Sequence, residues 1–145
     1  MPELIRSLVS RARIYLRDRR RSPRLRTRLL FSVSVHRNSN GHSLRQSEHV
    51  LKGHTRDLSA HGLALNLPQV HLDGYHLAAE ERELQLKLEL PDGLTSMLVI
   101  PRRYERLDEA ELGCSYLLAV RIVKISDEDL KRYSSFIARG LEESS

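Results

Sequence analysis

The feature that most constrains the fold is a strict alternation of leucine with polar residues over 84–90 (LQLKLEL). Successive side chains of a β-strand point to opposite faces, so this pattern predicts a strand with one buried and one exposed face. The segment Pro91-Asp92-Gly93 follows at once and is a strong turn signal. We therefore expect the chain to fold back on itself after this strand.

Similar patterns predict five further strands. Apolar residues alternate with small or polar residues over 31–35 and 63–67, and less regular apolar patterns indicate strands over 48–56, 96–106 and 113–125. Six short strands joined by turns, without intervening helices, predict a mainly all-β fold, an antiparallel barrel or a sandwich.

Two segments between these strands carry turn or loop signals. Asn38-Ser39-Asn40-Gly41 contains residues that tolerate positive φ, which predicts a turn after the first strand. The acidic segment 107–112 is expected to be a loop between the last two strands.

Helices are expected only at the two ends of the sequence. Residues from Leu4 to Leu16 place apolar side chains on one side at helical spacing, which predicts an N-terminal amphipathic helix. Such a helix could pack on the body of the protein, on a partner or on an anionic membrane surface, and the first two are the default. At the other end, Ser126 and Asp129 form a capping box before a second amphipathic stretch, and Gly140 is expected to stop that helix.

The length and composition fit one domain with a small extension. The chain has 145 residues, of which 40% are apolar. Cys114 is the only cysteine, which excludes an intrachain disulfide and a cysteine-based metal cluster and favours a reducing compartment. No segment approaches the about 18–20 apolar residues of a transmembrane helix, and we find no signal-peptide apolar region. We therefore expect a cytoplasmic protein.

The positive charge is concentrated near the N-terminus. Residues 1–28 carry ten arginines against two acids, a net charge of +8, whereas residues 29–145 carry fourteen Lys and Arg against seventeen acids, a net charge of −3. A cationic arm before a nearly neutral body indicates a local anionic ligand or partner and argues against a protein that binds nucleic acid over its whole surface.

The centre of that arm is the segment 17–28, in which seven of twelve residues are arginine. A planar guanidinium makes paired hydrogen bonds to phosphates and guanine edges and stacks on flat rings, which an ammonium group cannot do. Pro23 lacks a backbone donor and disfavours helical geometry at Ser22, so a preceding helix should end near Arg21. This leaves Arg20 to Arg24 in a loop, and we expect Arg26 and Arg28 to flank the first strand in solvent.

A second motif, Asp57-Leu58-Ser59-Ala60-His61-Gly62, lies before the third predicted strand. Asp-x-Ser-x-x-Gly alone is a weak signal, since these residue types often close turns. Together with Arg-x-x-x-Arg at Arg20 and Arg24 it resembles the PilZ domain, a bacterial receptor for the second messenger cyclic di-GMP. The segment 86–93 (LKLELPDG), Leu112-Gly113 and a C-terminal helix fit the same family.

The resemblance covers residues 17–141 and implies a six-stranded antiparallel β-barrel closed at one end by the C-terminal helix. Residues 1–16 would form an N-terminal extension outside this domain, and residues 142–145 a short tail. The family resemblance also implies a binding protein, and the sequence contains no arrangement that identifies an enzyme or a cofactor site.

The chemistry of the two motifs suits cyclic di-GMP, which offers two phosphates and two guanines. Arg20 and Arg24 could hold guanine O6 and N7, neutralise phosphate or stack on a purine. The Asp57 carboxylate only accepts hydrogen bonds, which suits guanine N1–H and N2–H and selects against adenine. We expect Ser59 to add a hydroxyl contact and Gly62 to let the backbone approach the ligand.

Two neighbouring arginines, Arg19 and Arg21, are further ligand-binding candidates. In the family, the residue before Arg-x-x-x-Arg is thought to influence whether one ligand or an interleaved pair binds, and Arg19 at that position favours the pair. We expect ligand binding to reposition the N-terminal segment and thereby signal to a downstream protein partner.

Three alternatives remain open at the level of sequence. The +8 arm could bind nucleic acid, although we expect no nucleic-acid partner, and affinity would then fall steeply with salt. The chain could instead be a PilZ-like interaction protein that binds no nucleotide, but such proteins typically lack the two motifs. All seven histidines lie between His36 and His76, yet their spacing predicts surface and loop positions and no metal site.

Overall fold

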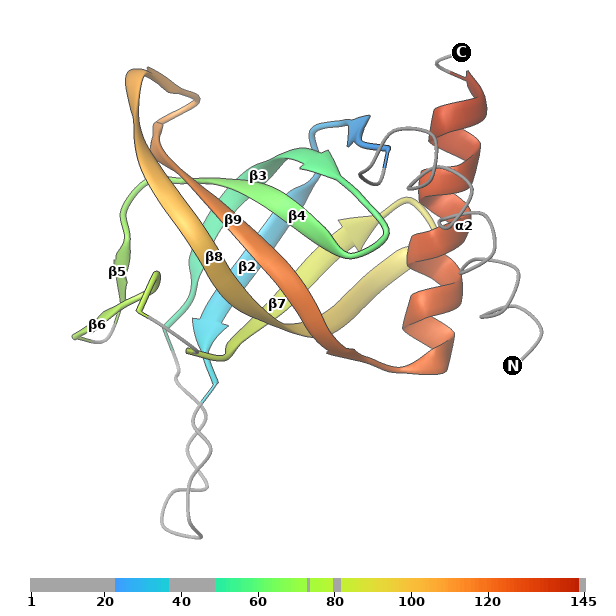
Figure 1. The fold of residues 1–145 in the computed structure, drawn as a ribbon, viewed down its shortest axis with the longest axis horizontal. Coiled ribbons are helices and arrows are strands. Elements are labelled where there is room, and N and C mark those ends of the chain that lie inside the picture. The colour runs from blue at the N-terminus through green and yellow to red at the C-terminus, as the bar shows by residue number, and fades with distance from the viewer. Residues whose placement is uncertain (1–22, 37–48, 73, 80–81, 144–145) are drawn as a thin grey trace, which may run out of the picture.

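The computed structural model describes residues 23–36, 49–72, 74–79 and 82–143 of the 145-residue chain (Figure 1). These residues form nine strands followed by one helix. In chain order the elements are β1 (Leu25–Arg26), β2 (Leu30–Val35), β3 (Leu51–Leu58), β4 (Gly62–Leu67), β5 (His71–Leu72), β6 (Tyr75–His76), β7 (Leu84–Leu90), β8 (Gly93–Glu111), β9 (Cys114–Ile125) and α2 (Asp127–Glu143).

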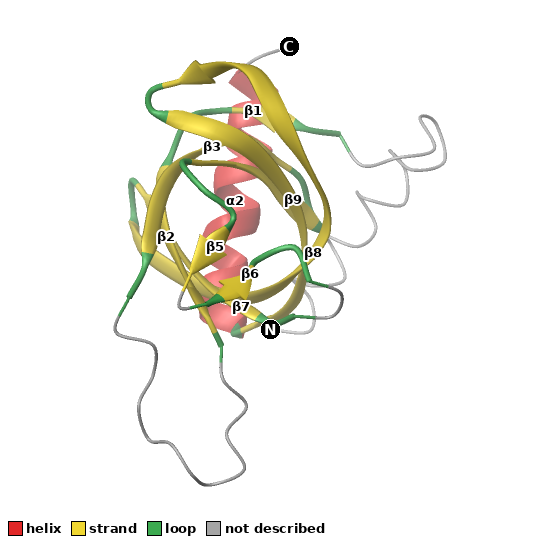
Figure 2. Cartoon of the chain, turned by 90° about the vertical axis from the view of Figure 1, so that its left-hand side faces the viewer, coloured by secondary structure: helices red, strands yellow, loops and turns green. Residues whose placement is uncertain are grey.

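Six of the strands form a closed antiparallel barrel, as predicted. The strand order is β3-β2-β7-β8-β9-β4, and pairing of β3 with β4 closes the ring. Strand β1 pairs with the C-terminal end of β3, on the same edge as β2. Figure 2 looks along the barrel and shows α2 across its far end. The short hairpin of β5 and β6 forms a separate sheet.

The interior of the barrel is filled mainly by leucine and valine. The alternation over 84–90 is realised in β7, where the four leucines are buried and Lys87 and Glu89 are exposed. From the helix, Tyr133 and Ile137 join the same core. Full burial of one such aliphatic side chain contributes about 1.5–3 kcal/mol, so this shared core explains why α2 stays on the barrel end.

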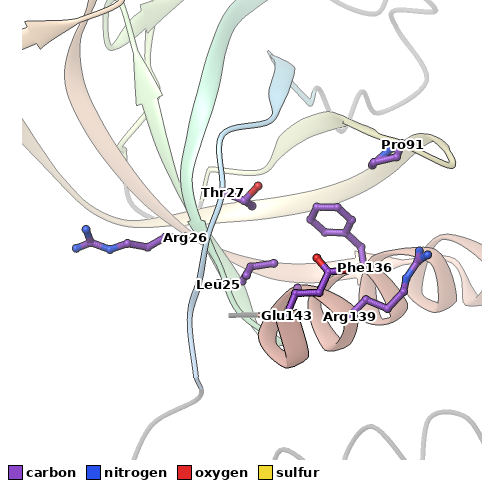
Figure 3. A pocket seen from close by; sticks show the side chains of 8 residues that line it. Leu25, Arg26, Thr27, Pro91, Phe136, Arg139 and Glu143 are labelled. Atoms are coloured by element: carbon purple, nitrogen blue, oxygen red, sulfur yellow. The ribbon is translucent and has the colours of Figure 1, made fainter. Parts of the chain in front are cut away.

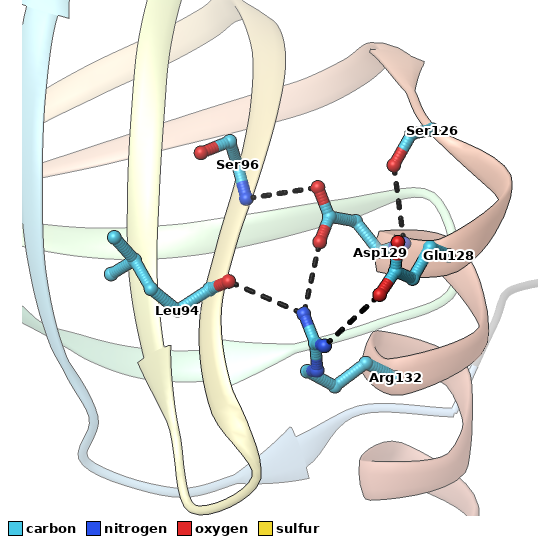
Figure 4. A network of polar contacts seen from close by, with 6 residues as sticks. All are labelled: Leu94, Ser96, Ser126, Glu128, Asp129 and Arg132. Atoms are coloured by element: carbon cyan, nitrogen blue, oxygen red, sulfur yellow. Dashed lines mark hydrogen bonds and ion pairs between the residues drawn. The ribbon is translucent and has the colours of Figure 1, made fainter.

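A polar network fixes the first turn of α2 against β8 (Figure 4). The Ser126 hydroxyl accepts a hydrogen bond from the Asp129 backbone N–H at 3.2 Å, as the predicted cap requires. The Asp129 carboxylate does not complete a capping box; it accepts from the Ser96 N–H at 3.4 Å. Arg132 donates to the Leu94 carbonyl at 3.3 Å and to Asp129 at 3.1 Å, which ties the helix to the strand.

The prediction of a loop over 107–112 is wrong. Strand β8 continues to Glu111, and the chain reverses in the two residues Leu112 and Gly113, whose φ angles are 50° and 79°. Positive φ at both central residues is typical of the type I′ turn, whose twist matches that of the flanking strands. The acidic residues therefore lie on a long two-stranded hairpin with β9, seen in orange in Figure 1.

Gly140 does not end the C-terminal helix, which continues to Glu143. A Cβ atom at Gly140 would collide with the Leu25 side chain of β1. The glycine therefore allows close packing of β1 on the helix. The short strands β1, β5 and β6 were not predicted, because two-residue elements carry no detectable periodicity.

Some sequence predictions fall outside the described residues. These are the helix from Leu4 to Leu16 and the turn at 38–41, and the proposed domain boundaries also stay predictions. No helix among the described residues is long and apolar enough to span a bilayer.

Candidate functional site

A hollow of about 430 Å³ lies on the outer face of the barrel, across β3, β4, β9 and β8. It contains four of the seven predicted site residues: Arg24, Asp57, Ser59 and Gly62. The other three, Arg19, Arg20 and Arg21, lie outside the described residues. Two motifs more than thirty positions apart in the sequence thus contribute to one hollow. The remaining lining residues are Arg56, His61, Leu63, Ala64, Arg102, Arg103, Leu117, Ala119, Val120 and Arg121.

The position of Arg24 depends on how the chain enters the barrel. Leu25 pairs with Leu58 in the short strand β1, which follows Arg24 directly. The Thr55 hydroxyl then donates to the Thr27 carbonyl at 2.6 Å and accepts from the Leu29 N–H at 2.9 Å. These contacts hold the chain after Arg24 against β3.

A β-bulge in β3 determines where Asp57 points. Thr55 pairs with Leu65 and Asp57 pairs with Ala64, so Arg56 is an extra residue in β3. A bulge interrupts the usual alternation and re-aims side chains, and here both Arg56 and Asp57 line the hollow. The sequence shows no sign of this extra residue.

The Asp57 carboxylate is close to one positive charge and largely shielded from water. Asp57 is 5% exposed, and its Oδ2 lies 3.3 Å from Nε of Arg56. A carboxylate in this position can accept hydrogen bonds from a ligand that enters the hollow. Burial makes such hydrogen bonds stronger than they would be in water.

The segment from Ser59 to Gly62 forms a closed turn beside Asp57. The Ser59 N–H donates to the Gly62 carbonyl at 2.9 Å, and the Ser59 hydroxyl lies 3.2 Å from both the Gly62 carbonyl and the Gly62 N–H. The Ser59 side chain therefore stabilises the turn. This role is additional to the ligand contact that we expect from it.

Gly62 also has a packing role that the sequence did not indicate. It pairs with Arg121 of β9, and a Cβ atom at this position would collide with the Val120 carbonyl oxygen. The glycine is therefore needed for β4 to approach β9, independently of any ligand.

Tyr133 links this turn to the C-terminal helix. Its side chain is fully buried, and its hydroxyl donates to the Ser59 carbonyl at 2.7 Å and lies 3.3 Å from the Gly62 carbonyl. Burial raises the pKa of the Tyr133 hydroxyl far above its ordinary value, and the nearby Asp57 charge raises the pKa further. Tyr133 is thus a neutral hydrogen-bond donor. From the sequence, Tyr133 was expected only to lie on the apolar face of the C-terminal helix.

The far side of the hollow carries three arginines that sequence reasoning missed: Arg102 and Arg103 of β8, and Arg121 of β9. Between them and Asp57, the floor includes the paired residues Ala64 and Ala119. Only the pairing of strands β3, β4, β9 and β8 brings these residues to one surface.

A second hollow, of about 410 Å³, lies between β1 and α2 (Figure 3). Leu25 and Phe136 give it an apolar lining, and Arg26, Arg139 and Glu143 lie at its margin. None of the four ligand-binding candidates that the structure describes lines it. Arg26 is exposed, as expected.

The histidine prediction needs one correction. His54 is buried in β3 at 4% exposure, and its Nδ1 lies 3.9 Å from the Cys114 sulfur. The pattern of β3 was too irregular to predict this burial. Among the described residues no group of three or more His, Cys, Asp or Glu side chains could hold a metal ion.

Comparison with known proteins gives a family and several similar folds. The family model described as PilZ domain matches residues 18–139. The PilZ domain of YcgR from Escherichia coli, solved with c-di-GMP, is similar with a TM-score of 0.60 and 14% identity, over 87% of this chain and 94% of that chain. A comparison with curated proteins found no match.

Two longer proteins contain a similar fold. The K. pneumonia MrkH–c-di-GMP complex gives a TM-score of 0.62 and 19% identity, over 87% of this chain and 53% of that chain. The Bacillus subtilis inhibitor of motility MotI/DgrA gives 0.59 and 18%, over 86% and 52%. The present chain thus spans about half the length of these two proteins, and at these identities the likeness concerns the fold alone.

Proposed function

The chain belongs to the PilZ domain family, and on this premise we propose that it is a receptor or adaptor that binds cyclic di-GMP in the hollow beside Asp57. The observation that carries the proposal is that Arg24 and Asp57, from two separate motifs, line the same hollow. The YcgR and MrkH structures, which have similar folds, contain c-di-GMP.

Asp57 would read a guanine base. A shielded carboxylate can accept hydrogen bonds from both N1–H and N2–H of guanine, whereas adenine has no donors at the equivalent positions. Arg56, whose Nε lies 3.3 Å from the Asp57 carboxylate, holds that side chain in place while leaving acceptor sites for a ligand. Guanine selectivity therefore rests on Asp57.

The arginine loop would supply the complementary cations. Arg24 lines the hollow, and Arg20 completes the Arg-x-x-x-Arg motif four residues earlier. Paired guanidinium contacts to phosphate or to guanine O6 and N7 fit both. Arg19 and Arg21 would add charge from the same loop.

The ligand would bind as an interleaved pair. Two molecules bring four phosphates together, and this charge needs more cations than one ligand requires. Arg19, directly before the motif, would help to supply them. Calorimetry on the wild type should give close to two ligands per chain, and Arg19→Leu should bring the value toward one.

Binding affinity tests the assignment of the site. Losing one good paired base contact costs about 1–3 kcal/mol, or roughly 5- to 150-fold in affinity, so Asp57→Asn should weaken cyclic di-GMP binding by that factor in calorimetry. Asp92→Asn is the matched control, because Asp92 is an exposed acid that pairs with Arg139 away from the hollow. Equal affinities of the two variants would show that the site is misplaced.

A nucleic-acid partner for the +8 arm is tested in the same series. If the arm bound nucleic acid, affinity for a random-sequence DNA duplex would exceed that for cyclic di-GMP, fall steeply with salt and show no dependence on Asp57. The receptor proposal requires that cyclic di-GMP binds more tightly than the DNA duplex and that its affinity depends on Asp57.

The signal would pass through the N-terminal segment. Clustered arginines repel one another until phosphates neutralise them, so ligand should order residues 17–28 and reposition residues 4–16 toward a downstream protein partner. Hydrogen exchange with and without cyclic di-GMP should show protection of residues 4–28. Equal exchange in both states would refute this route even if binding were tight.

A further inference from the structure

The three arginines on the far side of the hollow are not part of either sequence motif. Arg102 and Arg103 come from β8 and Arg121 from β9, and we call this group the β8–β9 rim. The family motifs place the ligand contacts on the other side, at the arginine loop and Asp57. The two motifs therefore do not explain why these three arginines line the hollow.

Strand register explains why two consecutive arginines face the hollow. In β8, Pro101 pairs with Val120 and Arg103 pairs with Ala119, so Arg102 is an extra residue. In an unbroken strand, neighbouring side chains point to opposite faces, but at this bulge both arginines line the hollow. Bulges are enriched beside functional sites, where they re-aim side chains.

The two bulges stand opposite each other across a floor of small side chains. Pairing gives one continuous row, Asp57–Ala64–Ala119–Arg103, across four strands. Three interstrand steps separate the backbones at the ends of this row by about 14 Å along the sheet. The bulge in β3 turns Arg56 and Asp57 into the hollow, and the bulge in β8 does the same for Arg102 and Arg103, while the alanines leave space between them.

The rim carries positive charge without an acidic partner in the described part of the chain. Among the described residues, Arg56, Arg132 and Arg139 form ion pairs within 4.0 Å, but the three rim arginines do not. Of the described residues that line the hollow, the one carboxylate is Asp57, which stands on β3 at the other end of the paired row. That carboxylate already pairs with Arg56 at 3.3 Å, so it is not the ion-pair partner of the rim.

We propose that the β8–β9 rim is a second anion site, which binds phosphate of cyclic di-GMP on the side of the hollow opposite Asp57. This inference rests on the proposed function. Guanidinium groups bind phosphate in paired geometry, and three of them converge from two adjacent strands. The phosphate could belong to the molecule held by Asp57 or to the second molecule of an interleaved pair.

Calorimetric titration of the full chain with cyclic di-GMP tests the proposal. The test variant is Arg103→Gln/Arg121→Gln, and the matched control is Arg106→Gln/Lys124→Gln. The control removes the same charge from the same two strands, at exposed residues that do not line the hollow. Since all four side chains are exposed, thermal unfolding midpoints should match wild type and show that both variants fold.

The test variant should bind about tenfold or more weakly than the control, or should bind one ligand where the control binds two. Weaker binding at unchanged stoichiometry assigns the rim to the phosphate of the first ligand, and loss of one ligand assigns it to the second. Arg103→Lys/Arg121→Lys should recover part of the loss, because it keeps the charge without the paired geometry.

Two results would overturn the inference, and they differ in what they leave standing. If the test variant matches its control in affinity and stoichiometry while Asp57→Asn weakens binding, the rim binds no phosphate and the receptor proposal stands. If the wild type itself binds no cyclic di-GMP, both proposals fail.

Discussion

Removing the Tyr133 hydroxyl should loosen both the barrel end and the turn beside Asp57. In Tyr133→Phe the ring still fills its place in the core, so no cavity forms. The change removes the donor that reaches the Ser59 carbonyl at 2.7 Å in a fully buried setting. Leaving a buried acceptor without its donor costs about 1–3 kcal/mol, and we expect the free energy of unfolding to fall by that amount.

Urea unfolding of wild type and variant measures this difference. Tyr104→Phe is the matched control, since Tyr104 is 48% exposed and should change stability by less than about 0.5 kcal/mol. Equal midpoints and slopes for Tyr133→Phe and Tyr104→Phe would refute the claim that the Tyr133 hydroxyl connects α2 to the turn.

The same residue predicts a pH dependence. Burial raises the pKa of Tyr133 in the folded state, whereas the unfolded side chain ionises near pH 10. The stabilisation from this group is therefore complete below about pH 10 and declines as pH rises further, because the unfolded state loses a proton that the folded state keeps. The decline is about 1.4 kcal/mol per pH unit. The difference between the wild-type and Tyr133→Phe curves of unfolding free energy against pH should isolate this decline. Parallel curves above pH 10 would contradict a raised pKa for Tyr133.

Two further predictions concern glycine positions. Gly140→Ala should lower the free energy of unfolding by up to about 2 kcal/mol in urea unfolding, because the added Cβ collides with Leu25. In a Leu25→Ala background the same substitution should raise the free energy of unfolding by up to about 1 kcal/mol, because alanine has the higher helix propensity. A change of the same sign in both backgrounds would refute the packing explanation. Leu112→Gly should raise the melting temperature slightly. Leu112 has a φ of 50°, and a left-handed conformation costs a non-glycine residue about 1–2 kcal/mol. A lower melting temperature of the variant would argue against strain in this turn.

The sequence determined the elements whose signals are local. Leucine alternation over 84–90 fixed a strand with a buried face, because the period of two is a property of the strand alone. The Ser126 cap was likewise visible, since a helix start depends on neighbouring residues. The two motifs, together with their positions relative to the predicted strands, were enough to indicate the family.

Only the tertiary structure decided what depends on strand register. The extra residues Arg56 and Arg102 create two bulges, and a shift of one residue moves a side chain to the other face of a sheet. Nothing in the local sequence marks those positions, because a bulge is defined by the partner strand. The same holds for Gly62, which packs against Val120 from 58 positions away. The arginine loop and Asp57 could therefore be named from sequence, whereas the rim of arginines facing them exists only because β8 pairs with β9 in this register.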